Sequence, residues 1–237
     1  MRMTSGWNPG PLAAFAALFL LLVSGCSTGL EPLQPVVPAD SADIKERCQA
    51  HFLHQPWQLV QSATLHGPGG NVRKAIMVLH VHPEQERIKC VITSLEGIVL
   101  FKAEYDQGPE ILRAVQPFQD EEFARALFGD IRMLLFPPEA GSIETGQSPC
   151  GVPACEYEPH GQGLVRVLLP GDGKREILQY SESQKHLQTI EASYNKAVSN
   201  PQNSQVQELI PERLIINRHG ALGYKLVLGL IEAKALD

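Results

Sequence analysis

Positive charge is scarce in this sequence, and the short motifs of several enzyme classes are missing. The 237 residues include 20 Lys and Arg against 26 Asp and Glu, which gives a formal net charge of −6. Proteins that bind nucleic acid carry a basic footprint, so nucleic acid is not an expected partner. The chain contains no GxSxG nucleophile elbow, no HExxH zinc helix and no CxxCH haem signature. We therefore predict no catalytic residue, no metal ligand and no cofactor, and we expect a protein that is not an enzyme.

Long hydrophobic runs are missing as well. One apolar run, residues 12 to 23, is shorter than the roughly 20 residues that a membrane-spanning helix needs. It is followed by Ser24, Gly25 and Cys26, an order typical of a secretory signal, and we predict a signal peptide over residues 1–25. The sequence VSGC that ends at Cys26 resembles the lipobox of bacterial lipoproteins, which implies a lipid-modified cysteine. The alternative is an ordinary signal peptide with an incidental cysteine.

The segment after Cys26 has the character of an anchor. In lipoproteins, aspartate after the modified cysteine favours the inner membrane, and here Ser27 stands at that position. This implies the outer membrane, on the side that faces the periplasm. Residues 27–43 contain three prolines, and Pro-rich segments are extended. We predict a lipidated, Pro-rich tether over residues 26–43 and a single folded domain over residues 44–237.

Only five cysteines are present, and four of them follow Cys26. An even number of cysteines in an exported chain is typical of disulfides. Cys150 and Cys155 flank a tight Gly/Pro turn, so we predict that they pair with each other. Cys48 and Cys90 are then the second predicted pair. Metal or redox use and free thiols are the alternatives, although redox centres usually have the closer CxxC spacing.

From residue 57 onward, apolar and polar residues alternate, which is the period of β-strands. Gly, Pro, Ser and Asn are frequent in residues 139–163 and 197–205, where we expect loops. The predicted strands span residues 57–66, 72–82, 86–95, 98–106, 110–115, 163–170, 173–181, 186–195, 207–220 and 222–233. The fold class is therefore mainly β (α+β), with about 9–11 antiparallel strands in a curved sheet.

Two histidines, His80 and His82, share one face of a predicted strand. A metal site could use such a pair. A solvated strand end just before Pro83 is the simpler interpretation, and we predict no metal site there.

One segment, residues 119–136, has the period of a helix instead. Asp120 is suited to cap its first turn and Pro137 to end it. Its apolar residues recur at helical spacing, at Phe123, Leu127, Ile131, Leu134 and Leu135.

The order of these parts resembles that of LolB, the outer-membrane lipoprotein receptor, and of uncharacterised lipoproteins related to it. The resemblance rests on the lipobox and on three further segments, which are ERIKCVITSLEGIVLFKAEYD (86–106), DEEFARALFGDIRMLLFPP (120–138) and IPERLIINRHGALGYKLVLGLIE (210–232). It spans most of the chain after the signal peptide. It implies a LolA/LolB-like half-barrel wrapped around one principal helix, with an apolar cavity for acyl chains.

The turn between the first two strands of that resemblance departs from the family. In LolB, a leucine protrudes from this turn and serves lipoprotein transfer. When the turns are aligned on Gly97, the equivalent position is Glu96, Leu95 is its neighbour, and the family's proline is missing. A relative that keeps the scaffold but handles another lipid is therefore an alternative to a transfer protein.

The predicted ligand-binding residues are apolar side chains on the inner faces of the expected sheet and helix, together with the turn leucine. They are Leu95, Val99, Phe101, Tyr105, Phe123, Leu127, Tyr224 and Leu226. The expected function is that of a lipid-anchored envelope lipoprotein which binds or transfers acylated cargo, a lipid or a lipoprotein. The expected partners are the outer membrane, this cargo and a periplasmic carrier.

Two alternatives remain open at this point. The apolar faces could simply pack on the helix and leave no cavity. The protein would then be a non-catalytic scaffold lipoprotein that docks on an envelope assembly or export machine, with residues 139–163 as the natural contact.

Overall fold

The computed structural model describes residues 30–236 apart from residues 68–69, 117, 139–142, 160–162, 172, 195–196, 201–202 and 221–222, and it leaves out the side chains of residues 197–207. The helical segments are α2 (Pro38–Gln49), the 3-10 turn η1 (Pro83–Gln85) and α3 (Glu121–Leu135). The strands are β1 (Trp57–His66), β2 (Val72–His82), β3 (Arg87–Thr93), β4 (Val99–Tyr105), β5 (Pro109–Ala114), β6 (Glu144–Gln147), β7 (Pro153–Tyr157), β8 (Leu164–Gly171), β9 (Lys174–Tyr180), β10 (His186–Ser193), β11 (Ala197–Asn200), β12 (Asn203–Leu209), β13 (Arg213–Arg218) and β14 (Tyr224–Ala235).

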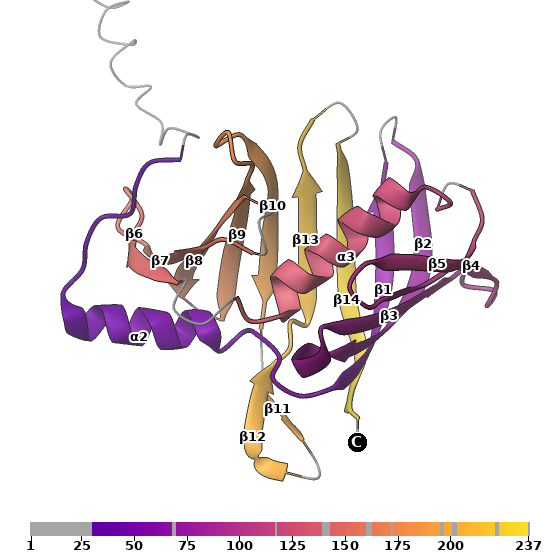
Figure 1. Ribbon diagram of the computed structural model, residues 1–237, viewed down its shortest axis with the longest axis horizontal. Helices are drawn as coiled ribbons and strands as arrows, with labels where there is room; N and C mark the ends of the chain where they lie inside the picture. Colours follow the sequence, from indigo (N-terminus) through magenta and orange to yellow (C-terminus); the bar gives the residue numbers. More distant parts are fainter. Residues whose placement is uncertain are drawn as a thin grey trace, which may run out of the picture.

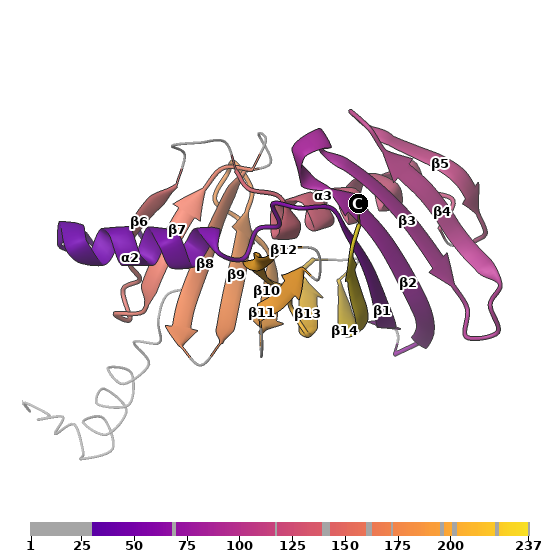
Figure 2. The ribbon, with the colours of Figure 1, turned by 90° about the horizontal axis from the view of Figure 1, so that it is seen from below.

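Twelve of these strands form one antiparallel sheet in the order β5-β4-β3-β2-β1-β14-β13-β10-β9-β8-β7-β6. Most neighbours follow each other in the chain, whereas β1 pairs with β14 from the opposite end of the sequence. The sheet is open and curves around α3, which crosses its concave face diagonally (Figure 1). Seen from below, the two wings of the sheet lie on either side of α3 (Figure 2). β11 and β12 form a separate hairpin.

The principal helix lies where its spacing predicts. The Asp120 side chain caps α3 by accepting a hydrogen bond of 2.8 Å from the backbone N–H of Glu122. Glu121 and Glu122 place negative charge at the positive helix end. The buried side of the helix includes Phe128 and Ile131, which join the inner face of the sheet in one hydrophobic core.

Helix α2 is not predicted by the sequence, because residues up to 43 are expected to form an irregular tether. The helix begins at Pro38, and Ile44 and Cys48 are its only buried residues. Ahead of it, Gln34 pairs with Gln147 in an isolated bridge. An apolar stripe of two residues is too weak a periodic signal to indicate a helix. Among the described residues, no helix is long and apolar enough to cross a membrane.

Two expected loops contain strands. β6 and β7 lie within the segment 139–163, and β11 with the start of β12 lies within 197–205. These strands are short and polar or contain proline, so their composition resembles that of loops. β6 and β7 extend the sheet at its edge, where neighbouring strands supply the hydrogen bonds that the sequence pattern does not reveal.

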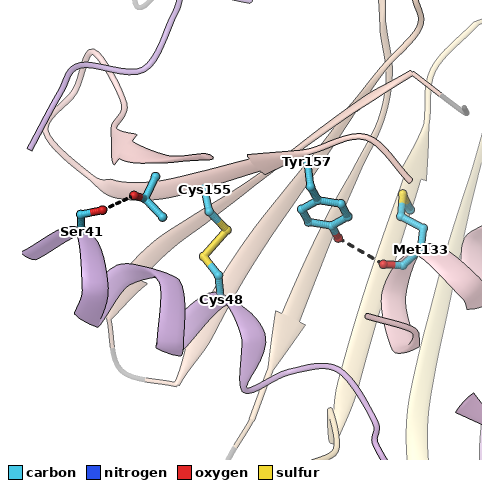
Figure 3. The surroundings of a disulfide bond; sticks show 6 residues. Ser41, Cys48, Met133, Cys155 and Tyr157 are labelled. Atoms are coloured by element: carbon cyan, nitrogen blue, oxygen red, sulfur yellow. Dashed lines mark hydrogen bonds between the residues drawn. A yellow bond between two sulfur atoms is a disulfide. The ribbon is translucent and has the colours of Figure 1, made fainter. Parts of the chain in front are cut away.

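The predicted disulfide pairs are wrong. Cys155 is bonded to Cys48, 107 residues away, so that the bond joins α2 to β7 (Figure 3). Cys150 lies in the turn between β6 and β7, whereas Cys155 lies within β7 and is fully buried. Cys90 is a free, buried thiol in β3, and burial raises its pKa to about 12. Closeness in sequence therefore predicts the wrong partner for Cys155, because the sequence pattern does not show that α2 lies beside β7.

Both helices lie on the same face of the sheet. Cys155 and Tyr157 are two residues apart in β7 and so point to the same side. Cys155 is bonded to α2, while the Tyr157 hydroxyl donates a hydrogen bond of 3.2 Å to the backbone oxygen of Met133 in α3 (Figure 3). A third contact, from the backbone N–H of Leu53 to the oxygen of Leu135, is 2.8 Å long. The C-terminal end of α2 is thereby tied to the C-terminal end of α3.

Candidate functional site

A large cavity lies between α3 and the inner face of the central strands. Its volume is about 890 Å³, which is within the range of small-molecule sites, roughly 300–1,000 Å³. Most of the side chains that line it are apolar. The apolar lining is made of Ala63, Leu65, Ala75, Met77, Leu79, Ile92, Leu100, Phe118, Phe123, Ala126, Leu127, Ile131, Leu134, Leu135, Leu187, Leu214, Ile216, Leu226 and Leu228.

The register of the strands places the lining residues of the sheet on one wall of the cavity. Ala63 of β1 is paired with Leu228 of β14 on one side and with Ala75 of β2 on the other. Paired residues point to the same face of a sheet, and so do residues two apart in a strand. The alternation that predicts the strands therefore also builds the apolar wall of the cavity.

Small residues explain why the space is not filled by side chains. Ala63 and Ala75 lie directly opposite each other in the sheet, and Ala126 and Gly129 line the cavity from α3. Protein interiors are otherwise close-packed, with few voids larger than a water molecule. Small side chains on both walls leave room at the centre of the interface between helix and sheet.

Four of the eight predicted ligand-binding residues line this cavity. They are Phe123 and Leu127 on α3 and Tyr224 and Leu226 on β14. Their role in binding a ligand remains a prediction, but the structure brings them together around one space.

The other four predicted residues lie outside the cavity lining. Phe101 is fully buried and packs edge-on against Phe123 with ring centroids 5.3 Å apart. Tyr105 packs on Phe128, and Val99 is half-buried at the start of β4. Leu95 lies in the turn between β3 and β4 and is 62% exposed.

Sequence reasoning missed most of the wall formed by β1, β2 and β13. Leu65, Met77 and Ile216 all belong to alternating segments, so the signal for an inward face was present. Which of the inward residues line a space and which fill it depends on the position of α3. That position is not encoded in any single segment.

A polar cluster interrupts the apolar wall at one end. Asp130 of α3 accepts a hydrogen bond of 2.8 Å from the side-chain amide of Gln188. Burial raises the pKa of Asp130 from 3.8 to about 6, against the opposing influence of Gln188, Arg218 and Tyr224. Burial likewise raises the pKa of Tyr224, and the neighbouring Asp130 adds to that effect. The cluster gives the cavity one end where polar groups of a ligand could be recognised.

The described residues contain no group of three or more His, Cys, Asp or Glu side chains placed to hold a metal ion. Of the histidine pair in β2, His80 lies 3.0 Å from the side-chain oxygen of Gln58, and His82 is half-buried next to Pro83. Hydrogen bonding to a neighbouring strand accounts for His80.

The fold is shared with a solved structure of low sequence identity. A LolA superfamily protein from Nitrosomonas europaea is similar with a TM-score of 0.51 and 13% identity, over 83% of this chain and 94% of that chain. A DUF1329 family protein from Desulfovibrio piger has a TM-score of 0.43 and 10% identity, over 85% of this chain and 93% of that chain. No family model and no curated protein sequence matches the chain.

The fold class is that of an open, curved antiparallel sheet wrapped around a helix, as predicted. More particularly, it is a LolA-like half-barrel, since the first of these structures has this fold. The narrower resemblance to LolB lipoproteins stays a prediction.

Proposed function

We propose that the protein binds the acyl chains of a lipid or a lipoprotein in the cavity beneath α3, and that it does so without catalysing a reaction. The observation that carries the proposal is the cavity of about 890 Å³ with its largely apolar lining. Apolar surface that faces a space of this size is stabilised when an apolar ligand removes it from water, by about 25 cal/mol per Å². The LolA-like fold is consistent with this role.

Titration with a fluorescent long-chain acyl probe tests the proposal. The protein is the chain from Ser27 onward, which includes every described residue. We expect saturable binding, and we expect Ala75→Phe to abolish it without loss of stability, because the added ring enters an open space. In a well-packed core, the same enlargement would cost about 1–3 kcal/mol.

Ala39→Phe on the exposed side of α2 is the matched control, and it should leave probe binding unchanged. Absence of saturable binding by the parent chain, together with a destabilised Ala75→Phe variant, would show a filled interior. The scaffold alternative would then be the better account.

We propose further that the protein is anchored to the outer membrane through a lipid on Cys26, where it faces the periplasm. The order of apolar run, small residues and cysteine supports this, and an acyl chain contributes about 0.8 kcal/mol of membrane affinity per buried methylene. Cys26→Ala should move the protein from the membrane fraction to the soluble fraction or leave an unprocessed precursor. Unchanged membrane association and unchanged electrophoretic mobility would contradict the anchor.

A further inference from the structure

The polar cluster of the cavity is built by three neighbouring strands and α3. Gln188 of β10 is paired with Arg218 of β13, which is paired with Tyr224 of β14. Residues that are paired across strands share a face, so this row points to the concave side. There it meets Asp130 of α3, whose carboxylate accepts from the amide of Gln188.

The cluster is buried, and its hydrogen bonding is incomplete. Gln188 is 0% exposed and Asp130 is 8% exposed. The amide oxygen of Gln188 has no hydrogen-bond partner among the described residues. A buried acceptor without a donor is costly, but Gln188 is not among the residues that line the cavity, so this group supports the polar character of the cluster and not a direct contact with a ligand.

Arg218 is the cation of this cluster, and its guanidinium has five N–H donors. No carboxylate oxygen of the described residues lies within ion-pair distance of it, since the ion pairs present there involve other residues. The same is true of Arg73, Lys74 and Arg125, which also line the cavity.

The lining contains three acidic side chains beside these four basic ones, and one of the three acts electrostatically on Arg218. The acidic side chains are Asp120, Glu122 and Asp130. Asp120 is engaged in capping α3, and Asp130 is hydrogen-bonded to Gln188. The lining therefore has one more basic than acidic side chain, whereas the chain as a whole carries a net charge of −6.

A second, shallower depression adjoins the cluster. It has a volume of about 480 Å³ and shares Arg218 and Tyr224 with the cavity. None of its lining residues is acidic, and Lys225 adds a further positive charge. Its remaining lining residues are His66, Thr189, Asn217, His219 and Gly223. Arg218 thus lies at the boundary between an apolar space and a polar, basic one.

We propose that the ligand of the cavity is an amphiphile with an anionic head group, a carboxylate or a phosphate, which is bound by Arg218 while the acyl chain lies along the apolar wall. This inference rests on the proposed acyl-binding function and adds the class of head group. Arg presents a planar fork of donors that matches both anions, and such charge-assisted hydrogen bonds are about twice as strong as neutral ones.

The test compares three ligands with the same alkyl chain, namely hexadecanoic acid, hexadecyl phosphate and uncharged hexadecanol. Each displaces an uncharged fluorescent acyl probe from the chain that begins at Ser27. We expect both anions to bind at least about tenfold more tightly than the alcohol, a difference of about 1.4 kcal/mol. The tighter of the two anions identifies the source of the head group.

Arg218→Gln should remove this preference. The affinity for the two anions should fall about tenfold, and the affinity for hexadecanol should change little. Arg113→Gln on the exposed edge strand β5 is the matched control and should behave as the parent chain does. Arg218→Lys keeps the charge and should retain part of the preference.

The outcomes separate the two proposals. Equal affinity of the unchanged protein for all three ligands would overturn the anionic head group and leave the acyl-binding function intact. The same conclusion follows if Arg218→Gln weakens the binding of hexadecanol as much as the binding of hexadecanoic acid. Failure of every ligand to bind, the alcohol and the probe included, would refute the proposed function itself. The selectivity of the unchanged protein needs no variant, so it decides the question even if Arg218→Gln does not fold.

Discussion

Asp130 is an acid whose ionisation opposes folding. Burial raises its pKa in the folded protein to about 6, from an ordinary value of 3.8. The folded state therefore holds the proton more tightly than the unfolded state does. The stability gained from the protonated carboxyl of Asp130 is fully present below pH 3.8 and is lost as the pH rises through 6.

Asp130→Asn removes this pH dependence, because asparagine is always neutral and its oxygen can still accept from Gln188. The free energy of unfolding of the variant should rise relative to the parent chain by about 3 kcal/mol between pH 3.5 and 7, since one pKa unit corresponds to about 1.4 kcal/mol. Urea unfolding at a series of pH values measures the difference. Asp120→Asn, at the exposed start of the same helix, is the control; if its profile matched that of Asp130→Asn, the burial of Asp130 would not be the cause.

Among the elements, α2 depends most on a covalent bond. Only Ile44 and Cys48 are buried in it, and the disulfide from Cys48 to Cys155 closes a loop of 107 residues. A crosslink over that length restricts the unfolded chain and is worth about 4–5 kcal/mol in the chain-entropy account. Cys48→Ser and Cys155→Ser should each lower the free energy of unfolding by an amount of this order.

The double variant should be no less stable than the single ones, because either substitution already removes the bond. Peptide mapping under non-reducing conditions provides a direct check of the pairing. A peptide in which Cys48 is joined to Cys90, or Cys155 to Cys150, would show that the connectivity is different.

A buried carboxylate contributes to the attachment of the β11–β12 hairpin to the rest of the fold. Glu208 of β12 is 4% exposed and accepts hydrogen bonds from the backbone N–H groups of His54 and Gln55, at 2.8 and 3.1 Å. It also accepts from the indole N–H of Trp57. Two donors from the segment between α2 and β1 and one from the first residue of β1 thus converge on one side chain.

Glu208→Gln replaces one acceptor oxygen by a donor and should cost about 1–3 kcal/mol of stability. Trp57 is the only tryptophan after residue 25, so in the chain from Ser27 onward its fluorescence reports both local change and global unfolding. Glu232→Gln, an exposed position on β14, should leave stability and the spectrum unchanged. Equal stability of the two variants would mean that Glu208 is not a structural anchor.

The sequence predicts those elements whose apolar residues recur with a regular period. α3 and the long strands such as β1 and β2 have that period because one face of each packs on the core. β6 and β7 lack it because they are short and are stabilised by neighbouring strands. α2 lacks it because only two of its residues are buried, and a disulfide joins it to the sheet. A local pattern does not show which distant segment contacts an element. The cysteine pairs are predicted wrongly for the same reason.

At the scale of the whole molecule, the sequence predicts the cavity only in part. Phe123, Leu127, Tyr224 and Leu226 line it, whereas Phe101 fills the adjoining core. Both sets are apolar and face inward, so periodicity does not distinguish them. The distinction arises from the place where α3 crosses the sheet and from the small residues Ala63 and Ala75 at that crossing.

The central claim is that an acyl chain occupies this space. Met77 and Met133 are the only methionines after residue 25. Both are buried, at 3% and 2% exposure, but only Met77 lines the cavity. They therefore form a matched pair of buried methyl reporters, one in the lining of the proposed site and one outside that lining.

The most direct measurement is an NMR experiment on the chain from Ser27 onward, with ¹³C-labelled methionine methyl groups and hexadecanoic acid added to saturation. The account predicts intermolecular NOEs between the acyl methylene protons and the methyl group of Met77, and none to Met133. A ligand that gives no NOE to Met77, or equal NOEs to both methyl groups, would contradict binding in the cavity.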